Sequence, residues 1–163
     1  MDVKLKKIAK EDIPDLTQAM TKAFDDDTQR YLRIEKGGPE GYDNGDFFRK
    51  WLFPHDNCEG YKIVVNGETV GGLLVWLYKN KDNTWGSVFI DPVWQNKGVG
   101  TRAWQLIEQL YPDTRSWTLE TPGYSIKNHK FYRKLGFEKI KELDAEEHPG
   151  KSFIFRKMMA VNR

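Results

Sequence analysis

The sequence contains one cysteine, Cys58, among its 163 residues. A lone cysteine excludes an internal disulfide framework, argues against a metal cluster and suits a reducing compartment. The sequence also has no large excess of charge of one sign, because 26 basic and 24 acidic side chains leave a formal net charge of +2. Nucleic acid is therefore not expected as a partner, since no broad basic surface is available to bind it.

Long apolar runs are absent as well. The first residues, MDVKLKKIAKEDIPDL, are charged and lack the apolar stretch of a signal peptide, and no segment approaches the length needed to span a bilayer. We therefore predict no membrane partner and a cytoplasmic location. The hydrophobic fraction of 39%, which includes 6 Trp, suffices for a globular core. The length suits a single domain over residues 1–163.

The spacing of apolar residues predicts the order of helices and strands. A helix is expected after Asp12, and a glycine-rich loop should run from residue 25 to 45. The turn Asn66-Gly67 joins two apolar runs, which indicates an antiparallel hairpin. The expected strands are 4–9, 61–65, 69–78, 84–90, 116–121, 137–142 and 152–159, and the expected helices 12–24, 46–53, 99–111 and 125–136. The predicted fold is a single-domain α/β fold, with one mixed, mostly antiparallel twisted sheet of about seven strands flanked by about four helices.

Two glycines, Gly98 and Gly100, stand where the third helix should begin. A helix start has unpaired N–H groups and the positive end of the helix dipole, so it attracts phosphate. Lys97, Thr101 and Arg102 add donors or charge at the same place. The simpler alternative is that the glycines only make a strand-to-helix turn.

Two nucleotide-binding patterns can be compared with this segment. A nucleoside triphosphate loop requires a lysine directly after its last glycine, but Thr101 follows Gly100 here. A dinucleotide-binding pattern fits better, because Gly98, Gly100 and Ala103 spell G-x-G-x-x-A and Glu120 lies twenty residues beyond Gly100. However, the residues DPVWQNK separate the glycines from the preceding strand, and the preceding strands form a meander. A dinucleotide oxidoreductase is therefore a distant alternative.

The residues before the glycines indicate a third pattern. The segment VFIDPVWQNKGVGT resembles the signature of the GNAT superfamily of acyl-CoA-dependent N-acyltransferases: a strand, a proline-containing link, and Q/R-x-x-G-x-G/A opening a helix. Gln95, Gly98 and Gly100 stand at those positions. The segment SIKNHKFYRKLGF is similar to the second signature of this family through Asn128, Tyr132 and the closing KLGF. Two motifs agree in order and spacing, so the resemblance is specific.

The resemblance covers nearly the whole chain and is strongest over residues 85–137. It implies a GNAT-like fold and acetyl-CoA as co-substrate, with no metal. The helix start would bind the coenzyme A pyrophosphate through backbone N–H groups, and the backbone of the preceding strand would pair with the pantetheine arm. The residues implied in cofactor binding are Phe89, Ile90, Gln95, Asn96, Lys97, Gly98, Val99, Gly100, Thr101 and Asn128.

The resemblance also implies catalytic roles. Tyr132 would donate a proton to the departing thiolate, and Glu120, at the end of the neighbouring strand, is the leading candidate for the general base. Each has a simpler alternative, because Tyr132 can serve packing alone and Glu120 can be a solvent-facing acid. Some sites in this family use water as the base. His129 is expected at the surface, and His55 and His148 in solvated loops.

The predicted function is transfer of an acetyl group from acetyl-CoA to a primary amine of a small molecule or a protein. A non-catalytic acyl-CoA sensor or interaction module of the same fold is the alternative, and a homodimer is compatible with the sequence. The acceptor pocket is expected from residues 25–53 together with Trp76 and Tyr78. Two groups of side chains are candidates for it, the acidic Asp25, Asp26 and Asp27 and the aromatic Tyr31, Trp51 and Trp76.

Overall fold

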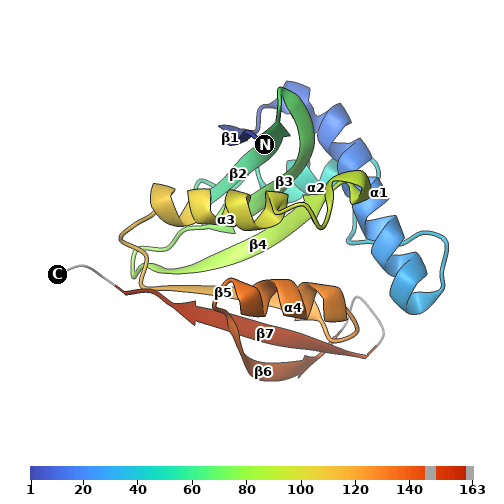
Figure 1. The fold of residues 1–163 in the computed structure, drawn as a ribbon. Coiled ribbons are helices and arrows are strands. Elements are labelled where there is room, and N and C mark those ends of the chain that lie inside the picture. Colours follow the sequence, from blue (N-terminus) through green and yellow to red (C-terminus); the bar gives the residue numbers. More distant parts are fainter. Residues whose placement is uncertain (146–149, 161–163) are drawn as a thin grey trace.

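The structure, a computed structural model, describes residues 1–145 and 150–160, so His148 lies outside the described residues. Its strands are β1 (Val3–Lys7), β2 (Cys58–Val65), β3 (Glu68–Trp76), β4 (Asp82–Ile90), β5 (Ser116–Pro122), β6 (Glu138–Asp144) and β7 (Lys151–Met158). Its helices are α1 (Ile13–Leu32), α2 (Asp46–Trp51), α3 (Val99–Leu110) and α4 (Ile126–Lys134), with short 3-10 turns at Lys10–Asp12 and Pro92–Trp94. Figure 1 shows the helices around one twisted sheet.

The strands form one seven-stranded sheet in the order β1-β2-β3-β4-β5-β7-β6. Neighbouring strands are antiparallel except β4 and β5, which are parallel because α3 connects them. The hairpin between β2 and β3 turns at Asn66 and Gly67, whose φ angles are 51° and 84°. The predicted α/β fold with one mostly antiparallel sheet is confirmed.

The first helix extends further than the sequence pattern predicts, and it ends at Leu32. The prediction was wrong here because the acidic residues 25–27 interrupt the apolar pattern. In the structure, Asp26 pairs with Arg30 one turn later, at 3.3 Å. The hydroxyl of Thr28 donates to the carbonyl oxygen of Gly37 at 2.7 Å, which fastens the following loop to the helix. The added helical turns carry residues 25–31 toward α4 (Figure 1).

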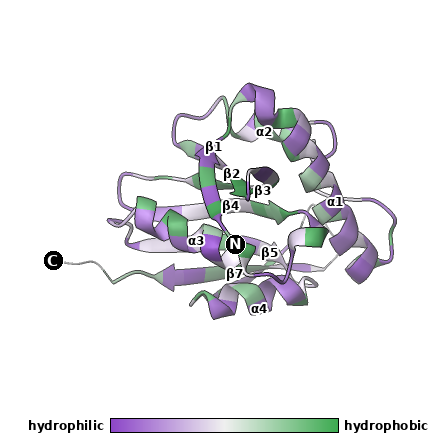
Figure 2. Ribbon diagram, turned by 45° about the horizontal axis from the view of Figure 1, so that its top comes forward, coloured by the Kyte–Doolittle hydropathy of each residue, from purple (hydrophilic) through white to green (hydrophobic). Residues whose placement is uncertain are grey.

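Two apolar clusters lie on opposite faces of the sheet. The helices α1 and α2 cover one face and α3 and α4 the other. Figure 2 shows hydrophobic residues along the central strands, while the end of α1 is largely hydrophilic. The first cluster includes Leu16, Met20, Phe48, Leu74 and Phe89. The second includes Trp85, Trp104, Ile107, Trp117, Tyr132 and Phe155.

The parallel strands β4 and β5 separate soon after they meet. Their pairing covers only Asp82–Thr84 with Ser116–Thr118. Beyond Thr84 the register of β4 against β3 shifts at Gly86, which forms a bulge. Because a bulge bends its strand, β4 turns away from β5 there. The two strands diverge toward the end of α1 (Figure 1). We call this separation the strand gap.

The contact between β3 and β4 requires a glycine at position 71. A Cβ atom there would lie 2.2 Å from the carbonyl oxygen of Phe89. We expect Gly71→Ala to lower the free energy of unfolding by about 1–3 kcal/mol, because the backbone of β4 must move. Urea denaturation measures the loss, with Thr69→Ala on the same strand as control. Equal stability of Gly71→Ala and wild type would contradict the close approach.

Candidate functional site

One edge of the strand gap is a stretch of β4 whose backbone groups do not all pair with β3. The N–H of Asp91 donates to the carbonyl oxygen of Val70 at 2.8 Å. Because backbone groups of an antiparallel strand point alternately to its two sides, those of Ile90 and Val88 point away from β3 and toward the gap. The carbonyl of Phe89 instead faces β3, and its side chain is buried among the α1 and α2 residues. Of the two strand residues predicted to pair with a cofactor, Ile90 therefore presents its backbone to the gap.

The loop after β4 leads into the start of α3. Gly98 is the residue before the helix and has a φ of 82°, a conformation that glycine adopts without strain. The first helical bond runs from the N–H of Arg102 to the oxygen of Gly98. The N–H groups of Val99, Gly100 and Thr101 therefore have no partner within the helix. They provide donors for an anion at this end of the strand gap.

The start of α3 comes very close to α4 at Gly100. A Cβ atom on this glycine would lie 3.0 Å from the Cζ atom of Phe131 and 3.2 Å from the Cδ1 atom of Ile90. Any side chain at position 100 would thus displace residues from both sides of the gap.

A lysine that the sequence motifs did not single out connects three segments around the gap. The Nζ atom of Lys127 donates to Gln95 at 2.8 Å and to Asp27 at 3.1 Å. Its backbone N–H donates to the hydroxyl of Tyr31 at 2.9 Å. Gln95 in turn donates from its Nε2 atom to the carbonyl oxygen of Ile90 at 2.9 Å. Lys127 thereby ties α1 and the loop after β4 to the start of α4.

We expect Lys127→Met to lower the free energy of unfolding by about 1–2 kcal/mol, because hydrogen bonds between charged, largely buried partners are lost. Hydrogen exchange should also become faster in the last turns of α1. Lys130→Met, an exposed lysine of the same helix, is the matched control. Equal stability of the two variants would show that the hydrogen bonds of Lys127 do not stabilise the fold.

The acidic triplet of α1 divides into three different environments. Asp25 accepts a hydrogen bond from the hydroxyl of Tyr42 at 2.6 Å, and burial together with this carboxylate raises the pKa of Tyr42 to about 12. Asp26 pairs with Arg30 within the helix. Only Asp27 is turned toward the start of α4, where it pairs with Lys127. Of the acids predicted as candidates for amine recruitment, Asp27 alone thus borders the strand gap.

Tyr132 lies on α4, one turn after Asn128, and is buried. Its ring contacts Trp85 of β4 edge-on, with the ring centres 5.3 Å apart. Burial raises the pKa of the Tyr132 phenol, and the negative charge of Asp27 raises it further. The phenol therefore stays protonated at neutral pH, as a proton donor requires. Among the described residues, no group hydrogen-bonds to its hydroxyl.

Glu120 lies on β5 between two buried residues, Leu119 and Thr121. Because side chains alternate along a strand, Glu120 points to the opposite face, the one that carries α1 and α2, and it is exposed there. Its strand neighbour is Ile154 of β7. Glu120 and Tyr132 thus belong to opposite faces of the sheet on the β5 side of the strand gap.

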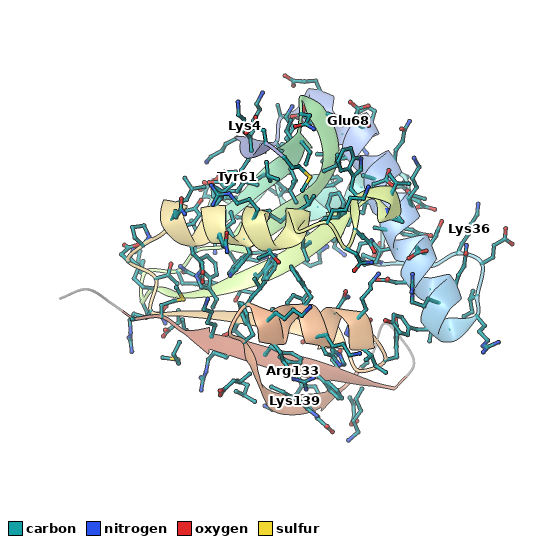
Figure 3. All side chains as sticks on the ribbon, viewed as in Figure 1. Lys4, Lys36, Tyr61, Glu68, Arg133 and Lys139 are labelled. Atoms are coloured by element: carbon teal, nitrogen blue, oxygen red, sulfur yellow. The ribbon has the colours of Figure 1, made fainter. Side chains whose placement is uncertain are left out.

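The expectation that His129 lies at the surface was wrong. Its side chain is 5% exposed, and its Nε2 atom hydrogen-bonds to the carbonyl oxygen of Pro122 at 2.9 Å. Burial lowers its pKa, and the charges of Arg133 and Lys139 act in the same direction. These two cations project from α4 and β6, away from the strand gap (Figure 3). His129 lies within the fold because the turn before α4 places its ring against Phe153.

Neither a membrane-spanning helix nor a cluster of metal-binding side chains is found in residues 1–145 and 150–160. No helix in these ranges has the length and apolar character needed to cross a membrane. Within the same ranges, no group of three or more His, Cys, Asp or Glu side chains is placed to hold a metal ion. His55 is partly exposed and its ring lies beside Trp51 and Trp76.

The fold and the strand gap define an acetyltransferase fold. A crystal structure of an acetyltransferase from Thermus thermophilus superposes with a TM-score of 0.76, at 17% identity and 98% coverage of both chains. The PaiA N-acetyltransferase of Thermoplasma acidophilum, crystallised with coenzyme A, has a TM-score of 0.72 at 15% identity, covering 98% of this chain and 100% of that one. The ribosomal-protein-S18-alanine N-acetyltransferase of Escherichia coli also reaches 0.72, at 14% identity, with 99% and 97% covered.

The sequence identifies the family. Residues 16–137 match the sequence pattern of the acetyltransferase (GNAT) family, so the chain belongs to it. An uncharacterised protein of Bacillus subtilis (strain 168), YrkN, is 36% identical over 90 residues. That match covers 54% of this chain and 48% of YrkN, so the matched region spans about half the length of this curated relative. The resemblance inferred from the two sequence motifs is confirmed.

Proposed function

We propose that this protein is an N-acetyltransferase that moves an acetyl group from acetyl-CoA to a primary amine of a small molecule or a protein. One observation carries the proposal: the strand gap has β4 backbone groups that face away from β3, a helix start whose first N–H groups have no partner within the helix, and Tyr132 beside it. The β4 backbone would suit the pantetheine arm of the cofactor, the helix start its pyrophosphate, and Tyr132 its thioester sulfur. Structural relatives crystallised with coenzyme A or acetyl-CoA support this choice.

The chain's own groups suit the cofactor in two places. The N–H groups of residues 99–101 would bind the pyrophosphate, with Asn96, Lys97 and Gln95 on the same loop. The backbone N–H of Ile90, whose carbonyl oxygen accepts from Gln95, would pair with the pantetheine arm, and Asn128 would approach it from α4. Phe89 pairs with Gly72 of β3 and so holds this part of β4 in place.

Acetyl-CoA supplies a thioester, whose C–S bond breaks as the amine nitrogen forms a new C–N bond. Tyr132 would donate its hydroxyl proton to the departing sulfur, which its raised pKa allows. Glu120 would accept the proton that the amine must lose, directly or through water. A cytoplasmic location and a homodimer stay predictions.

Calorimetric titration with acetyl-CoA, followed by a panel of amines and peptides assayed for free thiol, tests the proposal. We expect binding of acetyl-CoA and thiol release with at least one amine. Absence of binding to any acyl-CoA would overturn the function. Binding without turnover across the panel, and unchanged behaviour of Tyr132→Phe, would instead favour a non-catalytic acyl-CoA sensor.

A further inference from the structure

The bulge in β4 provides a platform for Trp76 beside the strand gap. A Cβ atom on Gly86 would lie 2.7 Å from the Nε1 atom of Trp76, so the indole ring rests directly on the glycine backbone. Trp51 and His55 hold the ring edge-on, with ring centres 6.5 and 5.1 Å away. The pyrrole edge of Trp76 is therefore fixed at the point where β4 bends away from β5.

The N–H group of this indole is available. Trp85, on the other face of the sheet, donates its Nε1 hydrogen to the oxygen of Ser87 at 3.1 Å. Among the described residues, no such acceptor faces the Nε1 atom of Trp76, and the side chain is only partly buried. Trp76 thus offers both an apolar ring and a free donor to a molecule in contact with this face.

The sheet register places an acid across from this ring. Trp76 pairs with Thr84, and Thr84 pairs with Thr118, so the three side chains share one face of the sheet. Glu120 lies two residues beyond Thr118 on the same face and is exposed. Two strand spacings separate Trp76 from the β5 strand, which is roughly 10 Å. This face of the sheet therefore carries an aromatic ring on β3, a threonine on each of β4 and β5, and a carboxylate on β5.

We propose that this surface binds the acceptor, and that Trp76 selects a primary amine carried on an apolar arm, such as an arylalkylamine. The inference rests on the proposed function and adds the class of substrate to it. Glu120 would attract the ammonium group by charge, while the arm lies against the indole ring. A polyhydroxylated amine would lose water from its hydroxyl groups against the ring without gaining hydrogen bonds there.

The experiment compares phenethylamine, ethylamine and glucosamine as acceptors at saturating acetyl-CoA. We expect kcat/KM for phenethylamine to exceed that for the other two by about tenfold or more, because a buried apolar arm contributes binding. Trp76→Ala should lower kcat/KM for phenethylamine about tenfold, leave ethylamine nearly unchanged, and leave the Kd for acetyl-CoA unchanged. Trp76→Phe keeps the ring without the N–H and separates the two contributions.

A substitution at Gly86 tests the role of the Trp76 ring without changing Trp76 itself. Gly86→Ala places a methyl group against the Trp76 indole, so it should reproduce the selective loss for phenethylamine. Leu110→Ala removes an apolar side chain that is 51% exposed on α3, and it should change none of the three acceptors. Retained acetyl-CoA binding shows that each variant is folded.

The outcomes separate the two proposals. If wild type acetylates amines but prefers glucosamine, or if Trp76→Ala lowers all three acceptors equally, the inference about Trp76 is overturned while the acetyltransferase function stands. If wild type binds no acyl-CoA, or acetylates no amine or peptide of the wider panel, both the proposed function and the inference about Trp76 are overturned.

Discussion

Gly100→Asp is expected to raise the Kd for acetyl-CoA at least about a hundredfold, which corresponds to roughly 2.7 kcal/mol. The new side chain would collide with Phe131 and Ile90, whose atoms lie 3.0 and 3.2 Å from its Cβ position. Its carboxylate would also bring a negative charge to the N–H groups at the start of α3, where the pyrophosphate is proposed to bind. Calorimetric titration with acetyl-CoA measures the effect.

Gly98→Asn is the matched control for this loop. Position 98 has a φ of 82° and open space where a Cβ atom would be, and asparagine tolerates that backbone conformation better than most residues. The control should therefore bind acetyl-CoA within a few-fold of wild type, while Gly100→Ala should fall between the two. Binding by a folded Gly100→Asp variant at wild-type strength would show that the phosphates lie elsewhere.

Tyr132→Phe is expected to lower kcat by about 10²–10⁴-fold, the usual contribution of a positioned proton donor, with the Kd for acetyl-CoA largely kept. The phenol donates only below its pKa. Because burial and Asp27 raise that pKa, the wild-type rate should not fall through loss of the Tyr132 proton as pH rises from 7 to about 9. Thiol release at saturating substrates across this pH range measures both effects.

Tyr31→Phe serves as the control for Tyr132→Phe. The Tyr31 hydroxyl also lies beside the strand gap, but it accepts a hydrogen bond from the backbone of Lys127 and has no proposed part in proton transfer. Its removal should change kcat only slightly. A Tyr132→Phe variant with normal kcat and a strongly raised KM for acetyl-CoA would contradict the proton-donor role and indicate a binding role instead.

Most of the fold follows from local patterns. The meander from β2 to β4 is predicted because β-branched and aromatic runs alternate with turn residues such as Asn66 and Gly67, and the structure has this hairpin. The extent of α1 was missed. Its last turns carry Asp25 and Asp26, whose partners Tyr42 and Arg30 stabilise the helix through contacts that an apolar pattern does not record.

The candidate site likewise contains some residues that the sequence indicates and others that it does not. The glycines at 98 and 100 and the pair Asn128 and Tyr132 are recognisable in the sequence, because each motif lies within one short segment. The bridge made by Lys127 has no such signal, since its partners Gln95 and Asp27 are 32 and 100 residues away. The buried environment of His129 likewise depends on β7, which comes later in the chain.

The sequence by itself determined the family, the order of the elements and the residues that open α3, because these depend on short spacings that local backbone chemistry dictates. Only the tertiary structure decided which backbone groups of β4 face the gap and which face of the sheet Glu120 occupies. It also decided that Trp76 rests on Gly86. The reason is physical: strand register, the bulge and the packing of α1 against α4 arise from pairing between distant segments, and one residue of register reverses the face to which a side chain points.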